Sequence, residues 1–249
     1  PNIACITSVD SDHLDIYGSG KELEESFKKF AKNIKKKGVL FNSFDLPFNG
    51  ISYGFNSKAQ YSIENYKIQD DHVLFNIRYN NRICKNIRFN MPGKHNACNA
   101  LAAFAICNLL KMKEDDLVKS FATFKGVKRR FSYVLKSPKI LIDDYAHHPK
   151  EIQAIYDSVQ SLYPKKKIMA VFQPHLFSRT RDFMNEFASE LSKFNEIVLM
   201  EIYPAREDPI NGIDSNELLK RIDNGNKKLL GKMELITHIV KSKVDVVVM

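Results

Sequence analysis

The sequence lacks any uninterrupted apolar run that approaches the roughly 20 residues needed to cross a bilayer, so insertion into a membrane is not expected. It also lacks a Gly-x-Gly-x-x-Gly motif after a predicted strand, which argues against a dinucleotide-binding fingerprint. Its four cysteines show no Cys-x-x-Cys spacing. A disulfide framework or a zinc ribbon is therefore not expected, and the reducing cytoplasm fits the cysteine usage best.

The charge balance is basic: 38 lysines and arginines face 29 aspartates and glutamates, a net charge of +9. Such a surplus attracts nucleic acid, an anionic membrane surface or a phosphate-bearing small molecule, and charge alone does not choose among them. Hydrophobic residues at 44% and charged residues at 27% are typical of globular proteins and argue against disorder. Because the sequence opens at Pro1 inside a predicted strand, without an initiator methionine, we expect it to be part of a longer protein.

The first half of the chain predicts an α/β domain, which we place at residues 1–131. A β-branched run over 3–7 predicts a buried strand, and a helical pattern that includes Leu23 and Phe27 follows it. Apolar and polar residues then alternate between 39 and 90, which predicts an antiparallel meander. Two amphipathic helices complete this half, after Pro92-Gly93 and before Gly126.

The second half, residues 132–249, has a different pattern, in which predicted strands alternate with predicted helices. The predicted strands are 140–142, 168–172, 197–200 and 244–248. Strands separated by helices of this length predict right-handed βαβ crossovers and a parallel sheet. We therefore expect a Rossmann-like second domain with its functional loops at the carboxyl edge of the sheet.

Two polar clusters in the first half have the composition of binding sites. His13 lies among aspartates just past the first predicted strand, where carboxylates and an imidazole can ligate a divalent cation, although the same residues make an ordinary turn or helix cap. Asn96 and Asn99 lie one turn apart on a predicted helix, where two amides can bind the edge of a nucleobase. Asn96 is alternatively an N-cap of that helix.

The second half carries further clusters at predicted loops. Arg129 and Arg130 can bridge phosphate oxygens, or else belong to a solvated basic linker. Asp143-Asp144-Tyr145-Ala146-His147-His148-Pro149 ends a predicted strand, and the next two strands deliver His175 with Arg179 and then a loop over 201–208. Three consecutive strand ends thus direct ionisable groups to one edge of the sheet.

These clusters, in this order, resemble the Mur ligases over nearly the whole chain. The matching segments are Asp12-His13, His95-Asn96-x-x-Asn99, Gly126-Val127-x-Arg129-Arg130-Phe131, Asp143 to Pro149, Phe172-Gln173-Pro174-His175 with Ser178-Arg179-Thr180, and Ile202-Tyr203-Pro204-Ala205 leading to Gly212-Ile213-Asp214-Ser215. The resemblance implies a central ATPase-type α/β domain, truncated so that its phosphate loop is missing, followed by a Rossmann-like C-terminal domain whose last residues are missing. It also implies an enzyme that uses ATP and Mg²⁺ to join L-alanine to the carboxylate of UDP-N-acetylmuramate through an acyl phosphate, in peptidoglycan precursor synthesis.

The resemblance further implies residue roles for nucleotide and metal. His13 matches the family's metal-binding histidine. Asn96 and Asn99 match its adenine-contacting pair, and Arg130 and Asp144 match residues that hold ATP phosphate and ribose.

The residues implied for chemistry overlap with these. Arg130, Asp144 and His175 are the expected catalytic residues. His148, His175 and Arg179 are expected to face the amino acid and the developing acyl phosphate, as substrate-binding residues.

The sequence also departs from the family pattern. The family's UDP-binding domain and its glycine-rich phosphate loop would lie upstream of Pro1, so we expect this chain alone to have no ligase activity. Leu176 and Arg206 stand where many relatives carry arginine and glycine, respectively.

A ligase that attaches a whole tripeptide to the same nucleotide sugar is the nearest alternative function. In a different class, the chain would be a non-catalytic module that binds polyanions through its charge, whereas the ligase prediction involves no nucleic acid.

Overall fold

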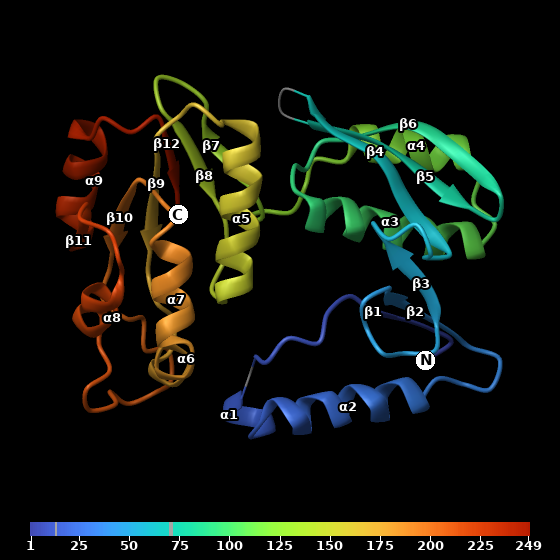
Figure 1. Cartoon of the computed structure of the whole chain (residues 1–249), viewed down its shortest axis with the longest axis horizontal. Helices are drawn as coiled ribbons and strands as arrows, with labels where there is room; N and C mark the ends of the chain where they lie inside the picture. Colours follow the sequence, from blue (N-terminus) through green and yellow to red (C-terminus); the bar gives the residue numbers. More distant parts are fainter. Residues whose placement is uncertain (13, 70–71) are drawn as a thin grey trace. The chain divides into compact units, whose positions relative to one another are not determined.

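The computed structural model describes residues 1–12, 14–69 and 72–249, which form two compact α/β units, 1–125 and 126–249 (Figure 1). The α/β fold class expected from the sequence is confirmed. The units divide a few residues before the boundary placed after Phe131. Residues 126–131 lie with the second unit because Phe131 is buried in its core and the Arg129 carbonyl accepts a hydrogen bond from the Tyr145 amide.

The first unit is built on a six-stranded sheet in the order β1-β2-β3-β4-β5-β6. Its strands are β1 (Ile3–Ile6), β2 (Val39–Ser43), β3 (Ile51–Gly54), β4 (Tyr61–Gln69), β5 (His72–Tyr79) and β6 (Arg82–Phe89). Its helices are α1 (Leu14–Tyr17), α2 (Gly20–Lys32), α3 (Lys94–Leu109) and α4 (Glu114–Thr123). Strands β1 to β4 pair in parallel, and β4, β5 and β6 pair antiparallel.

The predicted meander over 39–90 is thus confirmed for β4 to β6 and wrong for β2 and β3. The antiparallel turn between β5 and β6 uses Asn80 and Asn81 with φ of 44° and 58°, and asparagine tolerates this left-handed conformation better than most residues. Strands β2 and β3 are short and mostly half-buried, so a period of two is weakly expressed in their sequences. Alternation alone could not reveal that they run parallel to β1.

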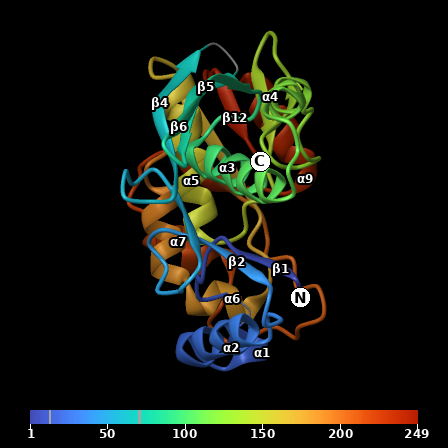
Figure 2. The same cartoon turned by 90° about the vertical axis from the view of Figure 1, so that its right-hand side faces the viewer.

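Helix α3 packs against the sheet of the first unit (Figure 2). Ala97, Leu101, Phe104 and Ala105 are fully buried in the same apolar cluster as Phe75 of the antiparallel strands. Small residues at the start of α3 allow the helix to approach the strands closely, while Phe104 fills the space further along. This packing fixes the first two turns of α3, where Asn96 and Asn99 lie.

The second unit is a six-stranded sheet in the order β11-β10-β9-β12-β8-β7, parallel except for the antiparallel edge strand β7. Its strands are β7 (Ser132–Leu135), β8 (Ile140–Asp143), β9 (Ile168–Phe172), β10 (Glu196–Leu199), β11 (Lys227–Leu229) and β12 (Val246–Val248). Its helices are α5 (Pro149–Leu162), α6 (Phe177–Asp182), α7 (Met184–Leu191), α8 (Ser215–Arg221) and α9 (Lys232–Lys241). The expected Rossmann-like architecture is confirmed, while edge strands β7 and β11 were not predicted.

Helices cover both faces of this second sheet (Figure 1). Helix α5 presents Ile152, Ile155 and Val159 at helical spacing to the apolar cluster that also holds α7, and α9 packs Leu235 and Ile239 against the opposite face. None of the helices within the described ranges is both long enough and apolar enough to pass through a lipid bilayer. The carboxyl ends of β8, β9 and β10 therefore emerge together from a buried core, and their loops carry the predicted residues.

Candidate functional site

The predicted adenine-contacting pair lies in the first turn and a half of α3, but its two members have different environments. The Asn96 side chain is buried and its Nδ2 donates to the Pro92 carbonyl at 2.7 Å. The N-cap of α3 is Gly93, with φ of 103°, so the alternative interpretation of Asn96 as the N-cap is wrong. Asn99 is exposed on the same helix. Its amide is accessible to a nucleobase, whereas that of Asn96 is engaged in holding the helix start.

The predicted metal ligand His13 lies outside the described residues. Among the residues that are described, no group of three histidines, cysteines, aspartates or glutamates could hold a metal ion. These residues do not form a magnesium site by themselves.

In the second unit, a tight turn brings the segment that precedes β7 against the loop that follows β8. Arg129 and Phe131 both have positive φ, at 60° and 47°. The Arg129 guanidinium lies 4.5 Å from the centre of the Tyr145 ring, a cation–π contact, and Nε is 3.6 Å from Asp143 Oδ1. Arg129 therefore contacts the loop after β8, while its side chain remains 54% exposed to solvent.

Asp144 fastens this turn through both of its carboxylate oxygens. Oδ2 accepts from the Phe131 amide at 2.8 Å and Oδ1 accepts from the Ala146 amide at 3.0 Å. Burial raises the pKa of Asp144, and the two amides together with the charge of Arg130 only partly oppose that rise. The carboxylate is thus held in one orientation by backbone donors.

Glu151, on the first turn of α5, joins Arg130 to the loop after β8. Its Oε1 lies 3.0 Å from Arg130 Nη1, and its Oε2 accepts from the His147 amide at 2.9 Å. Burial alone would raise the pKa of Glu151, but the His147 amide and the nearby positive charges hold it below its ordinary value. The Arg130 side chain, 46% exposed, remains accessible to an anion while Glu151 orients it.

The two adjacent histidines of this loop have different roles. His148 is 8% exposed, caps α5 by accepting from the Lys150 amide through Nδ1, and packs its ring edge-to-face on Phe183. His147 is less enclosed, and its Nδ1 donates to the Tyr145 carbonyl at 2.7 Å, which leaves Nε2 of the neutral ring as an acceptor. His148, the predicted substrate-binding residue, is a structural cap of α5. Of the two imidazoles, that of His147 is the more accessible to a ligand.

His175 follows β9 and stacks on Tyr203, which follows β10, with ring centres 5.4 Å apart. The Arg179 guanidinium, 7% exposed, lies 3.5 Å from His175 Nδ1. Since a guanidinium only donates, Nδ1 is the acceptor and the proton of the neutral ring lies on Nε2. Burial, and next the charges of Arg179 and His147, hold the pKa of His175 below its ordinary value.

The turn between β9 and α6 is unusual because Leu176 adopts φ of 71°, a conformation that leucine seldom takes. Its side chain is 5% exposed and its amide donates to the Tyr203 carbonyl at 3.0 Å. The core and the neighbouring loop together hold this turn, and with it the position of His175.

The structure therefore brings Arg130, Asp144, His175 and Arg179 to the carboxyl edge of the second sheet. It also gives contacts there to four residues that the sequence analysis placed in these loops without assigning them a role: His147, Glu151, Tyr203 and Glu207. The spacing of His147 and Glu151, four residues apart across a helix start, was the available sequence signal for their contact. His147, in the loop after β8, is one of the charges that lower the pKa of His175, in the loop after β9. An edge with two imidazoles and two guanidiniums has the chemistry to bind anions and to move protons.

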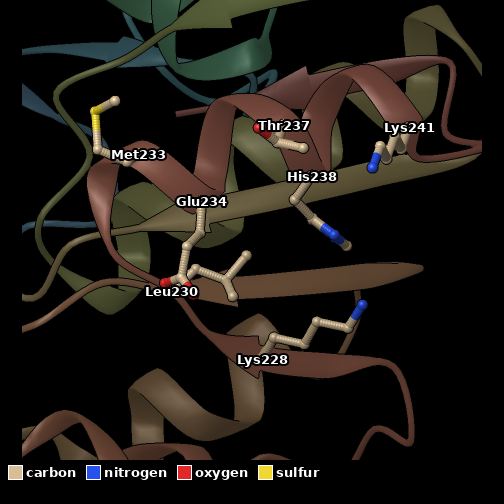
Figure 3. Close-up of a pocket in the computed structure, with 7 residues that line it drawn as sticks. All are labelled: Lys228, Leu230, Met233, Glu234, Thr237, His238 and Lys241. Atoms are coloured by element: carbon tan, nitrogen blue, oxygen red, sulfur yellow. The ribbon is translucent and has the colours of Figure 1, made fainter.

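A hollow of about 600 Å³ lies elsewhere in the second unit, between β11 and α9 (Figure 3). It is lined by Lys228, Leu230, Met233, Glu234, Thr237, His238 and Lys241. The Met233 side chain points away from the others, and His238 Nε2 is paired with the buried carboxylate of Glu196. None of the predicted site residues lines this hollow, and it is open and shallow, so it does not compete with the loop edge as the candidate site.

Comparison with known families accounts for most of both units. One profile, the Mur ligase middle domain, matches residues 1–107, and a second, the Mur ligase glutamate ligase domain, matches residues 129–248. The chain belongs to the Mur ligase family. The resemblance indicated by the sequence motifs is confirmed, and the two Mur ligase profiles fall on the two units of the structure.

Individual Mur ligases and their structures agree with this assignment. The chain is 49% identical over 249 residues to the UDP-N-acetylmuramate–L-alanine ligase of Flavobacterium psychrophilum, a match that covers 100% of this chain and 56% of the relative. It superposes on the crystal structure of the UDP-N-acetylmuramate–alanine ligase of Thermotoga maritima with a TM-score of 0.76 at 24% identity, covering 100% of this chain and 55% of that one. The MurF ligase of the same organism, crystallised with ADP, gives 0.78 at 17% identity, with coverage of 100% and 57%. The two structural matches show the fold, and the chain spans about half the length of the relatives.

Proposed function

We propose that this chain provides the middle and C-terminal domains of a cytoplasmic UDP-N-acetylmuramate–L-alanine ligase that acts in peptidoglycan precursor synthesis. The observation that supports this most strongly is the 49% identity along the whole chain to a ligase of that name. In the proposed reaction the γ-phosphoryl group of ATP passes to the muramate carboxylate. The amino group of L-alanine then attacks the acyl carbon, and phosphate leaves through a tetrahedral intermediate.

The loop edge of the second unit has the groups that this reaction requires. Phosphoryl transfer brings two anions together, and cationic side chains offset their repulsion and stabilise the charge that develops. Arg130 and Arg179 would supply such charge, each oriented by a contact within the unit: Arg130 by Glu151, and Arg179 beside His175. His175, with its ring proton on Nε2, would donate a hydrogen bond to a carboxylate or phosphate oxygen.

The attacking amine must lose protons during the second step. His147 holds its proton on Nδ1 against the Tyr145 carbonyl, so Nε2 of the neutral ring has the lone pair of a general base. We assign this role to His147 in place of His148, whose ring is engaged as a helix cap.

For the nucleotide, the residues present fit contacts with a base and with phosphate. The exposed Asn99 amide would bind the adenine edge, and Asn96 would position it by securing the first turn of α3. Arg130 would bind phosphate oxygens. Asp144, whose two oxygens both accept backbone amides, would act mainly by fixing the turn that carries Arg130.

The proposed function is tested by an assay of phosphate release with the protein expressed from its complete reading frame. We expect ATP-dependent release that needs both UDP-N-acetylmuramate and L-alanine. Release that responds to the tripeptide and not to L-alanine would assign the recycling ligase activity instead. Absence of amino-acid-dependent release, together with salt-sensitive DNA binding that survives Asp144→Ala and His175→Ala, would favour the polyanion-binding module.

A further inference from the structure

A third arginine, Arg206, lies in the loop that follows β10. The preceding residue, Ala205, has φ of 51°, and the Glu207 amide donates to the Pro204 carbonyl at 2.9 Å. The chain therefore makes a tight turn over 204–207, and Arg206 is exposed at that turn. The backbone at Arg206 is positioned by the contacts of the residues on either side of it.

Those contacts direct the turn to the site on both sides of Arg206. Before it, Tyr203 stacks on His175, forms a bridge with it, and donates its amide to the Pro174 carbonyl at 2.8 Å. After it, Glu207 Oε2 accepts from the Ser178 amide at 2.9 Å, and Oε1 accepts from the Ser178 hydroxyl. Arg206 is thus held between two residues that are fastened to the segment 175–178.

The charges around His175 agree with this placement. Arg179, His147 and Arg206 all lower its pKa, and Glu207 alone among these neighbours raises it. Glu207, the carboxylate among these neighbours, accepts from both donors of Ser178. Among the charges that act on His175, the positive ones, which include Arg179 and Arg206, therefore outnumber the negative one.

We propose that Arg206 is a substrate-binding residue that, with His175 and Arg179, holds a carboxylate or phosphate group at the carboxyl edge of the second sheet. Only the identity of this anion rests on the proposed function. In the proposed ligase, the anion is the carboxylate of the incoming amino acid or the phosphate of the acyl phosphate. A guanidinium suits either because it presents parallel donors to two oxygens. Arg206 would thereby strengthen the binding of that anion.

The placement and the binding role are tested separately by NMR on the 249-residue chain, with the ring resonances of His175 as the probe. Replacement Arg206→Gln removes a positive charge beside His175, so the pKa of His175 should rise, and Arg206→Lys should leave it near the wild-type value. Titration with L-alanine, with L-alaninamide, which lacks the carboxylate, and with inorganic phosphate should shift the same resonances. We expect Arg206→Gln to weaken binding of the responsible anion about tenfold, as for loss of one charge-assisted hydrogen bond.

The control is Arg221→Gln, which removes an exposed arginine of α8 that binds Asn185 and is expected to change neither quantity. Equal anion affinity in wild type and Arg206→Gln would overturn the proposal, as would an unchanged pKa of His175 or a wild-type protein that binds none of the probes. A carboxylate-only response assigns the site to the amino acid, and a phosphate response assigns it to the acyl phosphate. If the anion effect appears while the full-length protein shows no alanine-dependent turnover, the proposed function fails and the Arg206 site stands.

Discussion

The start of α3 and the loop between β8 and α5 make an informative comparison, because each carries a pair of neighbouring residues of one type. In each pair one member is buried with a local structural role and the other is more accessible. Asn96 holds the first turn of α3 while Asn99 is exposed, and His148 caps α5 while His147 is half-buried and helps to lower the pKa of His175. A sequence pattern locates such a pair, and the local hydrogen bonds decide which member is left for a ligand.

The two regions also differ in how they are held. The start of α3 depends on apolar packing and one side-chain bond to Pro92. The loop after β8 is held by a network in which Asp144 and Glu151 fasten backbone amides and an arginine. A single substitution in the network should therefore disturb the site more than one in α3.

The largest effect is expected for Asp144→Ala. It removes the acceptor for two amides and releases the turn that carries Arg130, so turnover of the full-length ligase should fall by about two to four orders of magnitude. Steady-state phosphate release measures this, with Asp157→Ala on the exposed side of α5 as the matched control. A folded Asp144→Ala protein with the wild-type rate would show that the network has no part in the reaction.

The second expectation separates the two histidines. His148→Ala removes an N-cap and a ring contact with Phe183, and should lower the free energy of unfolding by about 2 kcal/mol. His147→Ala should cost under about 1 kcal/mol in stability while reducing turnover more than His148→Ala does. Urea unfolding and phosphate release, measured on both variants, test the assignment. The reverse order in the two assays would restore His148 as the functional histidine.

A smaller contrast is expected in α3. Asn96→Ala should destabilise the protein by about 1 kcal/mol because the buried Pro92 carbonyl loses its donor. Asn99→Ala should leave stability unchanged within about 0.5 kcal/mol and raise the KM for ATP. Thermal or urea unfolding together with ATP titration distinguishes them, and equal effects in both assays would remove the distinction between the two residues.

The smallest effect concerns acid stability. The pKa of Glu151 is lowered by folding, so its contacts stabilise the protein above the unfolded value near 4.3 and are lost as the pH falls through the lowered folded pKa. Asp144 has the opposite sign, since folding raises its pKa. When the pH falls from 6 to 3, the free energy of unfolding of Glu151→Gln should decrease less than that of wild type. The difference between the two decreases should be under about 1 kcal/mol. Urea midpoints measure this against the exposed control Glu201→Gln, and parallel pH profiles would contradict it.

Prediction from sequence succeeded where periodicity or residue order carries the information. The alternation of strands and helices after residue 138 predicted the parallel sheet of the second unit, and the strand ends predicted the loop edge where Asp144, His175 and Arg179 lie. It failed for β2 and β3, because pairing direction depends on contacts that are distant in sequence. Edge strands β7 and β11 are short and largely half-exposed, and so lack a marked pattern.

The identity of individual site residues was harder to predict for a physical reason. Choosing between His147 and His148 requires knowing where α5 begins, and helix boundaries are the least certain part of any sequence reading. The role of Glu151 depends on the same boundary, because only the first turn of α5 brings its carboxylate to Arg130 and the His147 amide. Arg206 depends on the left-handed turn at Ala205, which no local residue preference indicates.

The left-handed backbone of Leu176 makes the position of His175 depend on the packing of the hydrophobic core. Glycine would adopt this conformation without strain, but it has no side chain to anchor the turn, whereas the buried leucine secures a shape that its own backbone disfavours. Removing apolar side chains that pack on Leu176 would thus loosen the turn that positions His175. Substitutions in the hydrophobic core would then alter the reaction rate of the proposed ligase without changing a residue that contacts the substrate.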